Sequence, residues 1–129
     1  VEHCGGCHCR AVRFAFQAPR DVVAWACNCS ICAMKQNTHL IVPKAKFQLA
    51  TPWEAMSEYR FNTKQARHLF CRTCGVCAFY QPRSNPEGWA VTLWCIDPGT
   101  LGEVETRHYD GQNWEQSFEA SKIASMTAE

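Results

Sequence analysis

The sequence predicts a single mainly β domain, and three observations support this fold class. The chain has 129 residues, the length of one ordinary domain, so residues 1–129 are expected to form one folded unit. Short stretches with alternating apolar residues recur along it, as in strands that bury one face. Proline and glycine residues separate these stretches as turns, and no internal repeat or linker interrupts them.

The first expected strand is residues 11–16, where Val12, Phe14 and Phe16 fall on one side. In chain order, the further strands are expected at residues 22–26, 38–42, 58–61, 67–71, 76–80, 89–95 and 104–108. Trp89 and Trp94 both belong to the strand expected at 89–95, and core packing is the simpler interpretation of both.

Two short helices complete the expected fold. Residues 30–36 predict one helical turn directly after a group of cysteines. Residues 113–122 predict a short C-terminal helix, because Trp114 and Phe118 are four positions apart and therefore share one helical face.

Composition and charge exclude several classes of protein. Apolar residues make up 47% of the chain, which is typical of a packed globular domain and not of a disordered one. The formal net charge of +1 gives no electrostatic reason to expect nucleic acid to bind through this domain alone. No apolar run reaches the roughly 18–20 residues of a membrane-spanning helix. No stretch has the pattern of a secretory leader.

Ten cysteines are unusual for a chain of this length and allow two interpretations. A disulfide scaffold is one, because the number is even and the chain is short. Metal binding is favoured, since seven cysteines stand in tight groups with one or two residues between them, and thiolates so close in sequence readily share one ion. Reduced thiols of this kind predict a cytoplasmic or nuclear protein.

The seven cysteines form two candidate metal sites. Cys7 and Cys9 (C-x-C) together with Cys71 and Cys74 (C-x-x-C) supply four thiolates, the number that closes a structural zinc site. We call these residues the four-cysteine cluster. Gly75 follows it and permits the tight turn that aims backbone amides at sulfur.

Cys27, Cys29 and Cys32 form the second group, the three-cysteine cluster, which has no evident fourth ligand. Three protein ligands with one open position is the arrangement of catalytic zinc sites.

Several alternatives remain open on the residues alone. The three-cysteine cluster would be closed if Cys4, Cys77, Cys95 or a histidine joined it, and Cys4 would form its own C-x-x-C with Cys7. Cys77 and Cys95 stand within apolar stretches and are expected to be buried core thiols, or else redox-responsive ones. His39 and His68 hold strand positions, which predicts packing or hydrogen-bonding roles, whereas His8 between two ligands is expected to face solvent.

The order and context of the cysteines resemble a known family. Gly-Gly-Cys-His-Cys at residues 5–9, Cys-Asn-Cys-Ser-Ile-Cys at 27–32 and Phe-Cys-Arg-Thr-Cys-Gly at 70–75 are similar to the glutathione-dependent formaldehyde-activating enzyme family. Within it, residues 35–37, 80–86 and 97–100 most resemble the branch that contains centromere protein V. Two features depart from the family pattern: Arg10 stands where the family has glycine, and Cys4 and Cys77 are additional.

The resemblance implies a β-tent of short antiparallel sheets held by zinc, with two zinc ions per chain. The four-cysteine cluster would hold the structural ion, and the three-cysteine cluster would hold the ion at which glutathione meets formaldehyde. The implied activity is that of a carbon–sulfur lyase forming S-hydroxymethylglutathione, with the glutathione sulfur as nucleophile. The resemblance to centromere protein V also allows a binding module without catalysis, making chromatin or cytoskeleton contacts.

Glutathione as a ligand requires cations, because it carries two carboxylates. Lys35, three residues after Cys32, and Arg83, in the proline-containing loop 81–86, are the candidates for these contacts. A small aldehyde is the expected second partner, and assembly into a homo-oligomer is compatible with the sequence.

Overall fold

The computed structural model describes residues 1–61 and 66–110 and confirms a mainly β fold with few, short helices. Its strands are β1 (Glu2–Gly6), β2 (Arg13–Gln17), β3 (Val22–Cys27), β4 (Thr38–Pro43), β5 (Phe47–Leu49), β6 (Met56–Tyr59), β7 (His68–Cys71), β8 (Phe79–Tyr80), β9 (Gly88–Thr92) and β10 (Val104–Tyr109). Its helices are α1 (Ser30–Lys35) and the 3₁₀ turns η1 (Lys44–Lys46), η2 (Trp53–Ala55) and η3 (Leu93–Cys95). The helix predicted at 113–122, with Trp114 and Phe118, lies outside the described residues.

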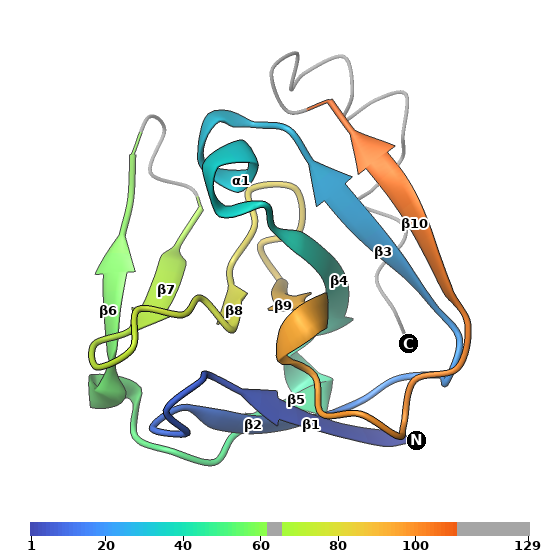
Figure 1. Cartoon of the computed structure of the whole chain (residues 1–129), viewed down its shortest axis with the longest axis horizontal. Coiled ribbons are helices and arrows are strands. Elements are labelled where there is room, and N and C mark those ends of the chain that lie inside the picture. The colour runs from blue at the N-terminus through green and yellow to red at the C-terminus, as the bar shows by residue number, and fades with distance from the viewer. Residues whose placement is uncertain (62–65, 111–129) are drawn as a thin grey trace.

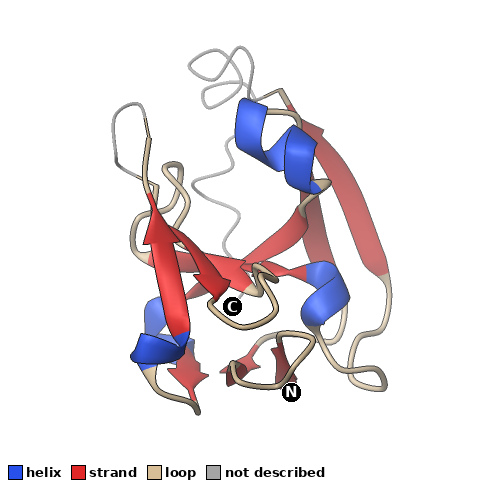
Figure 2. Ribbon diagram, turned by 60° about the vertical axis from the view of Figure 1, so that its left-hand side comes forward, coloured by secondary structure: helices blue, strands red, loops and turns tan. Residues whose placement is uncertain are grey.

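The strands form three small sheets that pack around a common core. One sheet has the order β1-β2-β5, the second has the order β10-β3-β4-β9-β8, and β6 and β7 form a separate hairpin. Figure 1 shows β1-β2-β5 along the bottom, the hairpin on one side and β3 with β10 on the other. In the second view, Figure 2, the short helices lie at the ends of the strands.

Pairing is antiparallel throughout the described sheets except in one place. β10 runs parallel to β3, with Val104 opposite Val22 and Tyr109 opposite Cys27. The strand expected at 104–108 is therefore present, but it pairs with a strand far away in sequence. Nothing in its local pattern indicates that direction, because alternation is the same in both kinds of ladder.

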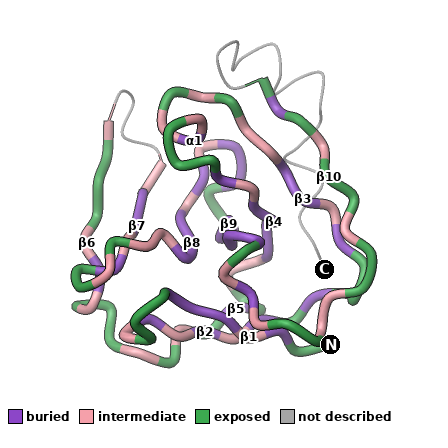
Figure 3. The backbone as a smooth tube through the Cα atoms, in the orientation of Figure 1, coloured by how far each residue is buried: buried purple, intermediate pink, exposed green. Residues whose placement is uncertain are grey.

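Alternating side chains build the main core. Val12, Phe14 and Phe16 are all buried, as the pattern of residues 11–16 predicts. The Phe14 ring meets Phe79 and Phe47 from other strands, and the rings of Phe79 and Phe47 are themselves centred 4.7 Å apart. Figure 3 shows that buried residues concentrate on β4, β7, β8 and β9, between the sheets, while β6 is largely exposed.

A second, smaller core lies beside the three-cysteine cluster. Its buried members are Trp25, Cys32, Ile41, Tyr80, Ala90 and Tyr109. Cys32 is thus both a candidate ligand and a core residue.

The sequence patterns miss or misplace some elements. β1 is not predicted, because two of its five residues are glycine, which strands disfavour. The structure requires glycine there: a Cβ on Gly5 would lie 2.3 Å from the carbonyl oxygen of Cys95. β5, of only three residues, is also missed. The strand expected at 76–80 is shortened to β8.

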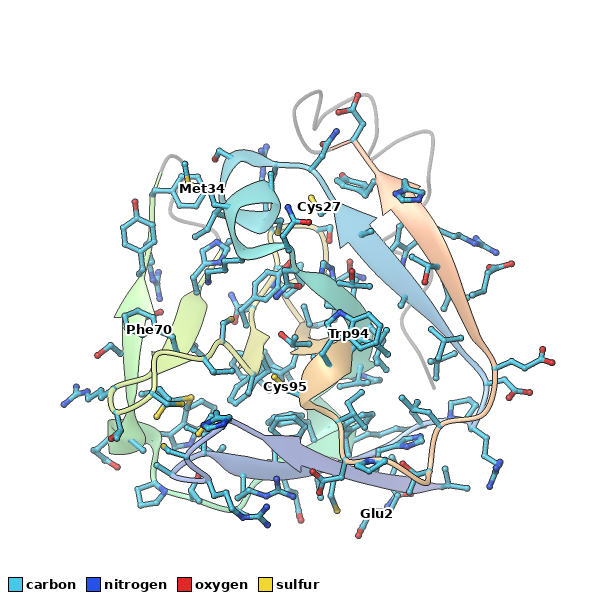
Figure 4. The ribbon with its side chains drawn as sticks, viewed as in Figure 1. Glu2, Cys27, Met34, Phe70, Trp94 and Cys95 are labelled. Carbon is cyan, nitrogen blue, oxygen red and sulfur yellow. The ribbon has the colours of Figure 1, made fainter. Side chains whose placement is uncertain are left out.

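The strand expected at 89–95 ends at Thr92, and residues 93–95 form η3 instead. This turn rotates the Trp94 side chain outward, so its assignment to the core is wrong: it is 77% exposed, whereas Trp89 is 6% exposed. Figure 4 shows Trp94 on the outside of η3.

No helix among the described residues is long and apolar enough to cross a membrane.

Replacing Phe79 by alanine should lower the free energy of unfolding by about 3–5 kcal/mol, because Phe79 is fully buried and contacts rings from several elements. Urea denaturation followed by circular dichroism measures this change. Trp94→Ala is the matched control: an exposed ring should change stability by no more than about 0.5 kcal/mol. Equal losses in the two variants would contradict the assignment of the core.

Candidate metal centres

The four-cysteine cluster joins two segments that are distant in the chain. Cys7 and Cys9 follow β1, while Cys71 ends β7 and Cys74 lies in the turn after it. The four sulfur atoms all lie within 4.8 Å of one another. The Cys9 sulfur is 3.7 Å from that of Cys7 and 3.6 Å from that of Cys71, 62 residues away.

These distances fit a tetrahedral thiolate site. A metal–sulfur bond of about 2.3 Å gives sulfur–sulfur edges of about 3.8 Å in a tetrahedron. Backbone N–H groups also point at the sulfurs, from Val12 to Cys7 at 3.3 Å and from Thr73 to Cys71 at 3.3 Å. Donors of this kind stabilise thiolate over thiol. At Cys74, backbone N–H groups, that of Val76 most of all, lower the pKa of the thiol to about 6. The cluster can therefore hold a metal ion.

Two left-handed residues shape the turns that carry these cysteines. Gly75 has φ of 79°, and its N–H bonds the Cys71 carbonyl at 2.9 Å, in agreement with the turn that the sequence predicts. Arg10, directly after Cys9, has φ of 70°. The turn after C-x-C thus keeps a conformation that suits glycine, although an arginine occupies it.

The three-cysteine cluster is formed within one short segment. Cys27 ends β3, Cys29 is the N-cap of α1, and Cys32 lies in α1, where it is 3% exposed. Figure 4 shows Cys27 between α1 and the end of β3. The three sulfur atoms lie within 4.8 Å of one another. Backbone N–H groups again donate to sulfur, from Cys29 to Cys27 and from Cys32 to Cys29, both at 3.4 Å.

No fourth ligand joins this cluster among residues 1–61 and 66–110, which contain all ten cysteines and all five histidines. Cys77 packs against the second core but is not one of the grouped sulfurs. Cys95 packs against the main core, and the Cys4 sulfur lies 3.9 Å from a carboxylate oxygen of Glu2. The structure therefore brings none of the alternative ligands into the cluster.

All ten cysteines are free thiols, so the structure does not contain the disulfide scaffold that the sequence left as an alternative. A separate pair of Cys4 and Cys7 is not formed either, because Cys7 lies with the four-cysteine cluster.

The charges of the three thiols depend on one another. Hydrogen bonds first from Cys27 and then from Cys32 lower the pKa of Cys29 to about 2. The same contact raises the pKa of Cys27 to about 11, and contacts with Cys27 and Cys29 raise that of Cys32. One thiolate thus forms readily and suppresses its neighbours. A cation among the three sulfurs would favour the ionisation of all of them, so the cluster could hold a metal ion.

Buried aromatic residues border the three-cysteine cluster. The Tyr80 hydroxyl oxygen lies 3.7 Å from the Cys32 sulfur, and the Tyr80 ring packs against both His39 and His68. Burial lowers the pKa of each histidine to about 4, so both are neutral near pH 7. The predicted packing roles of His39 and His68 are confirmed, and His8 is exposed as expected. Tyr80 is the residue that sequence reasoning missed: it stands at the end of an expected strand and begins the segment 80–86 that resembles the centromere protein V branch, but neither signal places it beside Cys32.

Lys35 and Arg83 differ in their relation to the cluster. Lys35 is exposed in the last turn of α1, and its ammonium group lies near Cys77 and His68. Burial raises the pKa of Cys77 and Lys35 opposes part of that rise, whereas burial and then Lys35 both lower the pKa of His68. Arg83 is half-buried in the connection between β8 and β9. Contact of either residue with glutathione stays a prediction.

Fold and site together define a class: a small mainly β domain with two separate groups of thiols, each able to hold a metal ion. The model of a family described as "Glutathione-dependent formaldehyde-activating enzyme" matches residues 2–117, and the chain belongs to this family.

A solved structure supports the fold. The crystal structure of a Rhodobacter sphaeroides protein is 32% identical to this chain and superposes with a TM-score of 0.67. The match covers 81% of this chain and 99% of that one.

Replacing Arg10 by glycine should stabilise the protein by about 1 kcal/mol, because glycine adopts φ near 70° without the strain of a side chain. Thermal unfolding of the metal-loaded protein measures the gain. Arg20→Gly is the matched control, a loop arginine whose φ is not positive, and it should not stabilise. Destabilisation by Arg10→Gly would show that the arginine side chain, and not the backbone, matters at this turn.

Proposed function

We propose that this protein binds two zinc ions and catalyses the addition of glutathione to formaldehyde at the three-cysteine cluster. The observation that carries the proposal is a group of three sulfurs with no fourth ligand among the described residues, in a member of this family. A site of this kind keeps a position for a substrate atom.

Zinc is the ion that best suits the donors. Both clusters offer sulfur alone, and tetrahedral thiolate sites are typical of zinc. The four-cysteine cluster has a complete set of ligands and is proposed as structural. Zinc held by the three-cysteine cluster would lower the pKa of a substrate thiol, so that the reactive thiolate is available at neutral pH.

The reaction itself needs neither an oxidant nor a reductant. The glutathione sulfur forms a bond to the formaldehyde carbon, the carbonyl π pair moves to oxygen, and that oxygen takes up a proton in place of the one lost from the thiol. The product is S-hydroxymethylglutathione. Because this addition also occurs spontaneously, the protein has to hold the two reactants and the thiolate in place and little more.

Cationic side chains are proposed to hold the carboxylates of glutathione. Lys35 is the better placed, because its ammonium group lies near Cys77, which packs against the second core, and near His68, which stacks on Tyr80 of that core. Arg83 is proposed as the second contact. In this scheme the three cysteines are ligands, and no cysteine of the chain is the nucleophile.

Loss of one cysteine should affect folding more in the four-cysteine cluster than in the three-cysteine cluster. Cys71→Ser breaks a link between distant segments and should lead to loss of cooperative thermal unfolding, because binding of metal by four thiolates is coupled to folding. Cys29→Ser should leave a folded protein with one zinc ion per chain, measured by native mass spectrometry. Two zinc ions in Cys29→Ser, or an unchanged melting curve in Cys71→Ser, would refute the assignment.

The activity itself is tested by the rate of exchange between formaldehyde, glutathione and S-hydroxymethylglutathione, measured by NMR exchange spectroscopy. The unmodified protein should accelerate exchange above the rate in buffer, and Cys29→Ser should return it to that rate. Cys4→Ser, whose thiol lies outside both clusters, is the matched control and should keep full activity. Rates equal to buffer for the unmodified protein with two bound zinc ions would favour the alternative, a binding module related to centromere protein V.

A further inference from the structure

The Tyr80 hydroxyl is buried directly against a ligand of the three-cysteine cluster. Tyr80 belongs to β8, is 6% exposed, and its oxygen lies 3.7 Å from the Cys32 sulfur. The two residues are 48 positions apart, so the fold and not the local sequence creates this contact. A distance of 3.7 Å is suitable for a hydrogen bond to sulfur, whose radius exceeds that of oxygen.

Two neutral histidine rings fix the position of Tyr80. His68 stacks on the tyrosine ring, with centroids 5.0 Å apart and planes 16° from parallel. His39 meets it nearly perpendicularly, with centroids 5.3 Å apart and an interplanar angle of 82°. These two ring contacts hold the tyrosine in place, with its hydroxyl oxygen next to Cys32.

A chain of hydrogen bonds determines which nitrogen of His39 carries hydrogen. The Thr92 hydroxyl donates to the carbonyl of Cys77 at 2.7 Å, so its oxygen accepts from the side-chain amide N–H of Asn37 at 3.2 Å. The carbonyl oxygen of the Asn37 side chain therefore faces Nδ1 of His39, at 3.0 Å. Since that oxygen only accepts, Nδ1–H of His39 must donate.

The remaining nitrogen of His39 is not a good acceptor for Tyr80. The tyrosine oxygen lies 3.4 Å from Nδ1 and 3.5 Å from Nε2 of His39. A hydrogen bond along the Nε2 lone pair would bring that nitrogen clearly nearer than the other. The near-equal distances place the oxygen off the lone-pair axis of Nε2, which favours the sulfur of Cys32 as the acceptor of the hydroxyl hydrogen.

We propose that Tyr80 is a positioning residue that donates its hydroxyl hydrogen to the Cys32 thiolate and so tunes the three-cysteine cluster. This inference rests on the proposed function only in assuming that the cluster binds a metal ion. When Cys32 is a thiolate it has no hydrogen to give, and the hydroxyl is then the donor.

The hydrogen bond offsets part of an unfavourable charge. Three thiolates and a divalent ion sum to one negative charge in a partly buried site, which opposes binding of a further thiolate such as that of glutathione. A donor on Cys32 withdraws electron density from one of the three sulfurs. Tyr80 thereby favours both retention of the ion and approach of an anionic sulfur.

Tyr80→Phe removes this hydrogen bond and little else. Cobalt(II) can be loaded in place of zinc. The second equivalent of cobalt is expected to occupy the three-cysteine cluster, where its sulfur-to-cobalt charge-transfer band reports on the three sulfurs. The band should move to lower energy in Tyr80→Phe, because the sulfur electrons are less stabilised. Zinc affinity of the second site, measured against a chromophoric chelator, should fall about tenfold. The affinity of the four-cysteine cluster should not change.

Two further proteins separate hydrogen bonding from packing. Tyr59→Phe removes a hydroxyl from a tyrosine that is 52% exposed and should leave the band and both affinities unchanged. Site-specific Tyr80→3-fluorotyrosine keeps the ring and makes the hydroxyl a stronger donor, so the band should move to higher energy. A mere change of packing would not produce opposite shifts in these two Tyr80 variants.

The possible outcomes distinguish this inference from the proposed function. Identical bands and zinc affinities within about twofold in the unmodified protein and Tyr80→Phe would overturn the role of Tyr80 alone, since a ligand's hydrogen-bonding partner normally changes affinity by more. Binding of only one metal ion by the unmodified protein would overturn both. Opposite band shifts together with weaker binding in Tyr80→Phe would support the inference.

Discussion

Four sulfur atoms from two distant segments lie within 4.8 Å of one another, and this meeting constrains how the sheets that carry them can be arranged. Four thiolates at such separations repel one another strongly unless a cation lies among them. No ladder of strand hydrogen bonds joins the sheet β1-β2-β5 to the hairpin β6-β7 in the described residues, so core packing and the four-cysteine cluster have to hold them together. When a structural thiolate site binds zinc, the binding free energy of about 10–16 kcal/mol adds to the free energy of folding. This is as large as the whole free energy of unfolding of an ordinary domain.

The three-cysteine cluster also offers cysteine sulfur, but its three residues lie close together in the sequence. Its sulfurs all come from residues 27–32, so an ion bound there would close no long loop and would contribute less to the arrangement of the sheets. Its surroundings are instead specific: the second core, two neutral histidines and the Tyr80 hydroxyl lie around it. A site that the fold does not depend on for stability can keep a position open for a substrate, which is the division of roles that we propose for the two clusters.

The local sequence pattern predicts those strands that bury one face. It fails where a contact between distant segments determines the backbone conformation. Residues 11–16 were placed correctly because Val12, Phe14 and Phe16 needed only a common side to reach the core. β1 was missed because Gly5 reflects the close approach of the Cys95 carbonyl, which no neighbour in the sequence indicates. Trp94 was misplaced because η3 ends the alternation at Thr92 without a proline or glycine to mark the change.

The sequence by itself determined the C-x-C, C-x-C-x-x-C and C-x-x-C groups of cysteines and the mainly β class, because these properties depend on residues within a few positions of one another. The meeting of Cys7 and Cys9 with Cys71 and Cys74 was predicted only by counting ligands, and the tertiary structure brings the four sulfurs together. Only the tertiary structure decided that no other thiol or imidazole among the described residues joins Cys27, Cys29 and Cys32, that β10 runs parallel to β3, and that a tyrosine hydroxyl lies on Cys32. Each of these facts depends on how separate segments pack. Side-chain periodicity specifies which face of a strand is buried, but it carries no information about which distant residue that face will meet.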